Sequence, residues 1–220
     1  MNPVLVLIVS LVAGAIPFSG MAAWRLKRVD LREYGSGTVS GTGLYRVAGF
    51  GPMVAAGILD VGKGALGPLL AGHSRPELAA LAGGLAVVGH NWSPFLRGAG
   101  GRGFSPSLGA LLVLAWPGAV MLLAVFVIGA VLKQAGLGMF VAMLALTPML
   151  AAIKGVEGVW IGLALAVPMF VKRLVGNHPA PSPKLRSYLT RLVFDHDGTS
   201  DEYRSPSVQA DSPGPDGEFA

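Results

Sequence analysis

The chain has 220 residues, of which 52% are apolar and only 13% are charged, and its mean hydropathy is +0.60. The apolar residues come in long runs rather than at amphipathic spacing, which is the composition of a multi-pass membrane protein. The absence of cysteine excludes disulfides, thiolate catalysis and cysteine-based zinc sites.

The basic charge is unevenly distributed along the chain. Residues 1–175 hold 13 Lys and Arg against 5 Asp and Glu, whereas residues 176–220 hold 4 against 7. Most of the basic residues lie at the ends of apolar runs, so the excess indicates membrane topology. It therefore argues against nucleic acid as a partner, although the sequence pI is near 9.8.

Six apolar runs have roughly the 17–25 residues that are needed to cross the hydrocarbon core. We therefore expect an all-α, polytopic transmembrane helix bundle in residues 1–175, with six countable spans. In chain order the runs are residues 1–23, 47–70, 78–96, 108–132, 137–153 and 156–175.

The first run has no basic residue before it and four between positions 25 and 32, which favours a retained helix with its N-terminus outside the cell. A cleaved leader is the alternative, because residues 19–23 are small. Alternation from a retained helix places residues 24–46, 97–102 and 154–157 in the cytoplasm.

The same alternation places residues 72–76 and 133–136 outside. A sixth full crossing would also leave Lys172 and Arg173 outside, against the positive-inside rule. Either one helix is missing from this count, or one run does not cross fully.

Two glycine-rich segments with basic side chains, residues 35–46 and 89–103, separate the apolar runs. Glycine brings the backbone close to a ligand and a guanidinium supplies fixed charge, so the combination suits a phosphate group at a membrane surface. Simple positive-inside anchors with flexible turns are the alternative. The candidate residues in these segments are Gly35, Ser36, Gly37, Arg46, His90, Asn91, Arg97, Gly100, Gly101, Arg102 and Gly103.

Asp60 and Lys63 lie three residues apart inside an apolar run, which puts them on one helix face within reach of an ion pair. Because buried charge is expensive in a membrane, such a pair faces a cavity or serves only as structural glue. His90, near the expected membrane surface, suits a base or a ligand contact, with a structural role as the alternative.

From position 176 the apolar signal stops, and residues 176–220 are expected to form a mostly disordered, polar, cytoplasmic tail. Apolar residues at helical spacing in residues 184–194 predict a short interfacial helix. His196 and Asp201 match the spacing of thioester-dependent acyltransferases, which we interpret as coincidence. No metal-ligand cluster is evident.

The order of four motifs resembles the bacterial acyl-phosphate glycerol-3-phosphate acyltransferases. They are residues 14–20, Gly35-Ser36-Gly37 ending at Arg46, residues 59–64, and Gly89-His90 leading to residues 100–103. The likeness covers residues 3–109 well and the rest only by hydropathy. It implies a seven-helix enzyme of the bacterial inner membrane whose motifs meet on the cytoplasmic side.

The resemblance also implies the reaction: a fatty acyl group moves from acyl phosphate to the sn-1 hydroxyl of glycerol 3-phosphate, giving lysophosphatidate, with no cofactor or metal. By position, Ser36 and Arg46 match the first-motif serine and arginine. Gly100, Gly101 and Gly103 match the phosphate-binding glycines, and Arg102 stands where the family usually has lysine.

On this basis we expect Arg46 and Arg102 to clamp phosphate and Ser36 to donate a hydrogen bond, with His90 or Asn91 aligning the attacking hydroxyl. Lys63, Arg97 and the loop glycines are further phosphate-binding candidates.

The family's C-terminal motif is reduced to Arg173-Leu174, which leaves open a non-catalytic relative that binds anionic lipid or a membrane enzyme. A small transporter is a further alternative, for which the intramembrane charges of Asp60 and Lys63 are the relevant feature.

Overall fold

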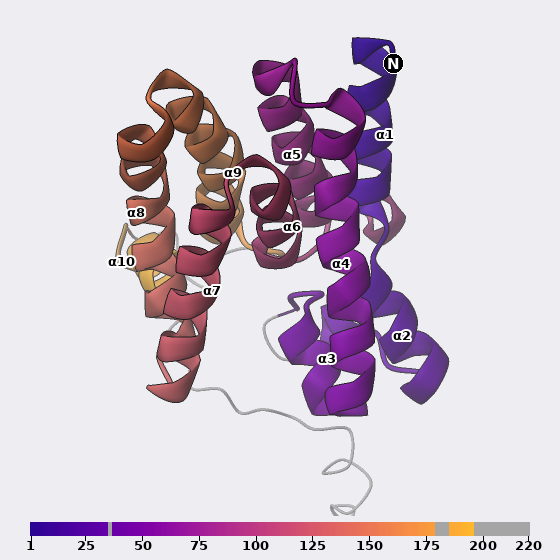
Figure 1. Cartoon of the computed structure of the whole chain (residues 1–220). Coiled ribbons are helices and arrows are strands. Elements are labelled where there is room, and N and C mark those ends of the chain that lie inside the picture. The colour runs from indigo at the N-terminus through magenta and orange to yellow at the C-terminus, as the bar shows by residue number, and fades with distance from the viewer. Residues whose placement is uncertain (35–36, 179–184, 196–220) are drawn as a thin grey trace, which may run out of the picture.

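A computed structural model of the chain describes residues 1–34, 37–178 and 185–195 (Figure 1). Within these ranges every regular element is helical, which confirms the expected all-α class. The helices are α1 (Pro3–Ala15), α2 (Phe18–Lys27), α3 (Gly41–Ala48), α4 (Phe50–Ala71), α5 (Pro76–Asn91), α6 (Phe104–Leu114), α7 (Trp116–Val131), α8 (Ala135–Lys154), α9 (Val156–Val175) and α10 (Leu185–Phe194), with short 3-10 helices at Leu31–Glu33 and Pro94–Leu96.

The helices form two packed groups that meet where α5 contacts α9 and where α6 contacts α7 (Figure 1). Helices α1, α4 and α5 pack together with α6 against α4, and α7, α8 and α9 make the second group. The short helices α2 and α3 lie at the end of the bundle where α4 begins.

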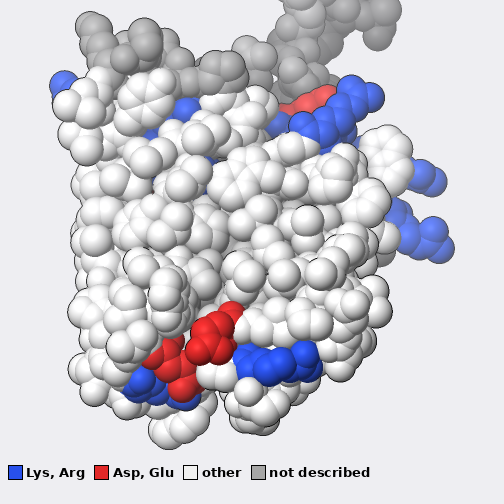
Figure 2. Space-filling view, turned by 90° about the horizontal axis from the view of Figure 1, so that it is seen from above, with Lys and Arg blue, Asp and Glu red and all other residues white. Residues whose placement is uncertain are grey.

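In the part of the chain that the structure describes, four helical segments are long and apolar enough to cross a membrane: Pro3–Lys27, Phe50–Ala71, Ala135–Lys154 and Val156–Val175. Helices α6 and α7 are shorter and also apolar. Viewed from above, the surface is mostly uncharged, with Lys, Arg, Asp and Glu in a few groups near its margins (Figure 2). The chain is therefore a multi-pass membrane protein.

The run at residues 108–132, expected to cross once, is two helices. Helix α6 ends at Leu114, Ala115 takes an extended φ of −162°, and α7 begins at Trp116 with Pro117 in its first turn. Proline is tolerated in the first turn of a helix because a backbone N–H at that position would have no intrahelical partner. Counting α6 and α7 separately gives seven bundle helices among the described residues, as the family resemblance implied.

Because of this break, two later turns lie at the opposite ends of the bundle from those that the sequence predicted. Gly136 at the start of α8 accepts a hydrogen bond from Arg173, at the end of the bundle that holds the glycine-rich segments. Lys154 and Glu157, in contrast, line a hollow together with Gly72 and His73 at the other end. Relative to the glycine-rich segments, residues 133–136 and 154–157 therefore lie at the opposite ends of the bundle from those that six alternating spans predicted, because the 108–132 run reverses direction at Ala115.

The first run, residues 1–23, is also broken. The side chain of Asn2 caps the start of α1 by accepting a hydrogen bond from Val4 N at 2.9 Å. The helix ends at Ala15 because Pro17 disfavours the helical conformation in the residue before it. Ile16 is therefore extended, and α2 restarts at Phe18 in a new direction (Figure 1). This leaves carbonyl groups at the end of α1 without intrahelical partners.

Helices α4 and α6 approach closely because glycines face each other's backbone. A Cβ on Gly64 would lie 2.0 Å from the Pro106 carbonyl oxygen, and one on Gly109 would lie 1.9 Å from that of Val61. In a membrane no hydrophobic effect drives helices together, so their association depends on close packing. Small residues at the contact permit that packing.

We predict that Gly109→Val will destabilise the protein by on the order of 3 kcal/mol or more, because the new side chain overlaps the α4 backbone. Gly57→Ala is the matched control, since a Cβ on Gly57 meets nothing within 4 Å. Helix propensity should make the control neutral or more stable by about 0.5–1 kcal/mol. Thermal unfolding of the purified protein in detergent checks this, and equal melting of the two variants would contradict the α4–α6 packing.

Candidate functional site

The broken end of α1 opens a small hollow against α4, α5 and the second glycine-rich segment. Its polar wall consists of the side chains of Asp60, Lys63, His90 and Ser19. Gly100 and Gly101 complete it from the loop after α5. Lys63 of α4, His90 of α5 and Gly101 of the loop after α5 therefore share one site.

Lys63 holds the hollow together. Its ammonium lies 2.7 Å from Oδ1 of Asp60 and donates to the Ile16 carbonyl at 2.7 Å, so it pairs with a buried carboxylate and also bonds to the broken end of α1. Both side chains of the pair are only 4% exposed. The neighbouring carbonyl, that of Ala15, accepts from the Ser93 hydroxyl at 2.6 Å. The expected pair is confirmed, and one of its functions is structural.

His90 packs its ring against the second loop. A Cβ on Gly101 would lie 2.0 Å from Nε2 of His90, so any other residue there would require the His90 ring to move. The Gly101 amide donates to the His90 carbonyl at 3.1 Å, and the Gly100 amide donates to Oδ1 of Asn177 at 3.2 Å. These two glycines therefore serve close approach, and their amides are engaged within the protein.

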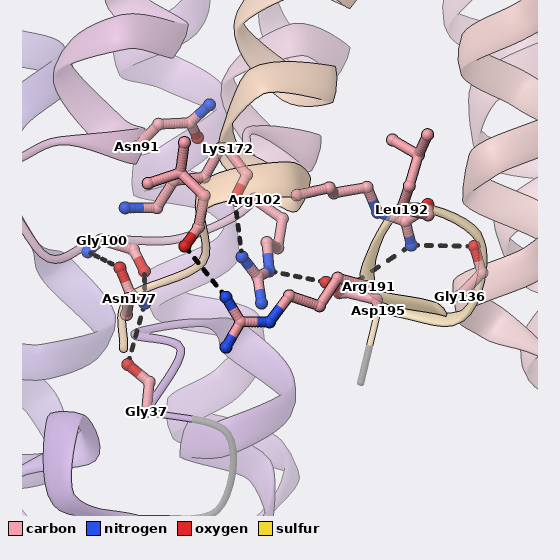
Figure 3. Close-up of polar contacts among 12 residues, drawn as sticks. Gly37, Asn91, Gly100, Arg102, Gly136, Lys172, Asn177, Arg191, Leu192 and Asp195 are labelled. Carbon is pink, nitrogen blue, oxygen red and sulfur yellow. Dashed lines mark hydrogen bonds and ion pairs between the residues drawn. The ribbon is translucent and has the colours of Figure 1, made fainter. Parts of the chain in front are cut away.

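Asn177 joins the two glycine-rich segments (Figure 3). Its amide nitrogen donates to the Gly37 carbonyl and to the Gly100 carbonyl, each at 2.9 Å. The amide of Val39 adds a direct bond to the Gly100 carbonyl at 3.1 Å. The two segments are thus fixed at one end of the bundle, as the sequence predicted.

Arg102 lies beside the hollow and turns toward α9 and α10 (Figure 3). Its Nη1 donates to the Lys172 carbonyl at 3.0 Å, and its Nε lies 2.8 Å from Oδ1 of Asp195. Arg173 lies 3.9 Å from the other oxygen of Asp195. Arg102 is therefore held between the backbone of α9 and the carboxylate that follows α10.

The remaining predicted site residues fall in different places. Asn91 is fully buried and donates to the Pro168 carbonyl at 3.0 Å, so it joins α5 to α9 and faces away from the hollow. Arg46 and Arg97 are exposed at the same end of the bundle as the glycine-rich segments, and Gly103 packs against Met169 and Asn91. Gly35 and Ser36 lie outside the described residues.

Sequence reasoning did not identify Asn177 or Ser93, because single polar residues beside long apolar runs carry no distinctive pattern. Gly176 gave a weak signal, since a glycine after the last apolar residue often ends a helix and turns the chain at that point. Among the described residues no group of three or more His, Asp and Glu could hold a metal ion.

We predict that Lys63→Met alone will destabilise the protein by about 3–5 kcal/mol, because it leaves the Asp60 carboxylate buried and unpaired. The double variant Asp60→Asn with Lys63→Met should recover most of that stability. Thermal unfolding of both variants in detergent measures the difference. A double variant as unstable as the single one would show that the ion pair is not what holds this position.

A family model described as glycerol-3-phosphate acyltransferase matches residues 4–177. Glycerol-3-phosphate acyltransferase 4 of Dehalococcoides mccartyi strain CBDB1 is 34% identical over 222 aligned residues, which cover 94% of each chain. Glycerol-3-phosphate acyltransferase 1 of Deinococcus radiodurans is 44% identical over 119 residues, which cover 52% of this chain and 58% of that one.

The fold is similar to the crystal structure of PlsY (YgiH), an integral membrane glycerol 3-phosphate acyltransferase, in its glycerol 3-phosphate form. The TM-score is 0.71 at 24% identity, covering 79% of this chain and 88% of that one. The lysophosphatidic acid form gives a TM-score of 0.68 at 21% identity. From the family match and the relatives, the chain belongs to the glycerol-3-phosphate acyltransferase family.

Proposed function

We propose that this protein transfers a fatty acyl group from acyl phosphate to the sn-1 hydroxyl of glycerol 3-phosphate, giving lysophosphatidate and inorganic phosphate. The observation that carries this proposal is the junction that Asn177 makes between the two glycine-rich segments, in a chain of this family. It brings His90 and Arg102 beside one hollow at one end of the bundle.

The chemistry needs little from the protein. An acyl phosphate is an activated mixed anhydride, so the hydroxyl oxygen attacks the acyl carbon, the bond from that carbon to the phosphate oxygen breaks, and phosphate leaves with its electron pair. Catalysis then consists of aligning the two reactants and stabilising charge on the departing phosphate. No protein nucleophile is required.

The position of each side chain in the structure indicates its role in this reaction. Arg102 and Arg46 hold phosphoryl groups, and Arg97 adds positive charge to the loop surface. His90, whose ring lies against Gly101, is placed to accept a hydrogen bond from the attacking hydroxyl or to pass its proton to the leaving phosphate. Ser36 remains a proposed donor from the first segment. Asn91 is assigned to helix packing, because its amide is bonded to α9.

The glycine-rich segments belong on the cytoplasmic side of the bacterial inner membrane, with the N-terminus outside. Support comes from charge, because α2 carries Arg25 and Lys27 at the glycine-rich end, and the turn at Lys133 lies at that end as well. Basic residues concentrate in the cytoplasmic loops of membrane proteins. The C-terminal segment after α9 then also lies in the cytoplasm.

We predict that Arg102→Ala and Arg46→Ala will each lower kcat by about 100- to 1,000-fold, since each removes a fixed positive charge from a phosphoryl group in the transition state. Arg25→Ala, an exposed arginine on α2 at the same end, is the control and should keep full activity. The assay uses purified protein with palmitoyl phosphate and labelled glycerol 3-phosphate. Wild-type turnover in both site variants would remove the assignment, and an inactive wild type would favour a non-catalytic relative.

A further inference from the structure

The C-terminal segment places a carboxylate on the arginine assigned to phosphate. Oδ1 of Asp195, the residue after α10, lies 2.8 Å from Nε of Arg102, and the two side chains are 26% and 15% exposed. The contact is a poorly aligned one, because the Nε–H is not hydrogen-bonded to this oxygen. It is therefore an ion pair without the directional bond that would make it strong.

Asp195 and an incoming phosphate would compete for the same cation. Arg102 already gives Nη1 to the Lys172 carbonyl, and the carboxylate lies against Nε (Figure 3). Two anions within a few ångströms of each other repel, and a phosphate that bonds to the guanidinium with aligned donors gains more than the carboxylate does. Substrate phosphate thus displaces Asp195 rather than joining it.

The backbone at Asp195 takes the left-handed conformation that is common just after a helix end, with a φ of +59°. Aspartate enters this region more readily than most residues, and Arg28, Arg97 and Lys133 adopt it as well. Glycine fits this conformation best, so it can replace Asp195 without strain at the end of α10.

Polar contacts help to hold helix α10 in place, and the backbone of Phe194 also packs against Gly136. Arg173 donates to the Leu192 carbonyl at 2.8 Å, and Arg191 donates to the Val175 carbonyl at 3.2 Å (Figure 3). The helix packs mainly on α8 and α9, at the edge of the bundle. It can therefore release Asp195 without disturbing the packing of α4, α5 and α6.

We propose that Asp195 is a built-in competitor that occupies Arg102 until a phosphate monoester displaces it, so that α10 sets the substrate concentration at which the enzyme works. The proposal rests on the phosphate-binding role assigned to Arg102 under the proposed function. Its consequence is that the carboxylate raises the apparent Kd for the phosphate substrate without taking part in the chemical step.

The test compares Asp195→Asn and Asp195→Gly with the wild type in the full chain. Glycine suits the φ of +59°, so it removes the carboxylate while preserving the end of α10. Both variants should bind the phosphate substrate about 3- to 10-fold more tightly, with kcat unchanged within about twofold. Glu157→Gln, which neutralises a carboxylate in an ion pair at the other end of the bundle, is the control and should change nothing.

Two measurements separate the sources of phosphate. Calorimetric titration with glycerol 3-phosphate gives its Kd without turnover, and steady-state assays at saturating acceptor give the KM for palmitoyl phosphate. Tighter binding in either arm supports the proposal and identifies which phosphate meets Arg102. Unchanged constants in both arms overturn it, as does weaker binding, which would make Asp195 a positioning residue for Arg102. If Asp195→Asn leaves binding unchanged while Arg102→Ala still lowers kcat as predicted above, only this inference fails and the proposed function stands.

Discussion

The structure depends on how the protein treats the carbonyl groups that the break at Ile16-Pro17 exposes. Backbone carbonyls at a helix end are costly to leave unpaired inside a membrane, so donors from other parts of the chain supplement the local bond that the Ile16 carbonyl accepts from Phe18 N at 3.2 Å. Lys63 of α4 takes the carbonyl of Ile16, and Ser93 of the second glycine-rich segment takes that of Ala15. Satisfying one broken helix thereby fixes α1, α4 and the second segment around a single hollow.

A second set of contacts, at Asn177, positions the charged and polar side chains around that hollow. Asn177, just after α9, bonds to the backbone of both glycine-rich segments, so the end of α9 determines where Arg102 and His90 lie. Because the bonds go to backbone carbonyls, they fix loop position without using the arginine or histidine side chains. A frame that is fixed through its backbone can hold two reactants in alignment, which is what acyl transfer without a protein nucleophile requires.

Much of this could be predicted from the sequence, and the misses have physical reasons. Long apolar runs gave the helical class, and the three-residue spacing of Asp60 and Lys63 gave their ion pair. The reversal at Ala115 was missed because Trp116-Pro117-Gly118 interrupts neither hydropathy nor length, although proline so placed permits a new helix to start. Asn91 was assigned to the site by its position beside His90. Its side chain points elsewhere, however, since successive residues on a helix do not share a face. Contacts over long sequence separation, such as Asn177 with Gly37, leave no local pattern.

The central claim is that both glycine-rich segments meet at one surface of the membrane, together with the turn before α8. Because the chain has no cysteine, single cysteines at Thr42, Phe95, Gln134 and Ser74 report sidedness cleanly. Labelling with a membrane-impermeant maleimide on sealed inverted and right-side-out vesicles should place Thr42→Cys, Phe95→Cys and Gln134→Cys on one side and Ser74→Cys on the other. Thr42→Cys and Phe95→Cys on opposite sides, or Gln134→Cys on the side of Ser74→Cys, would contradict the account.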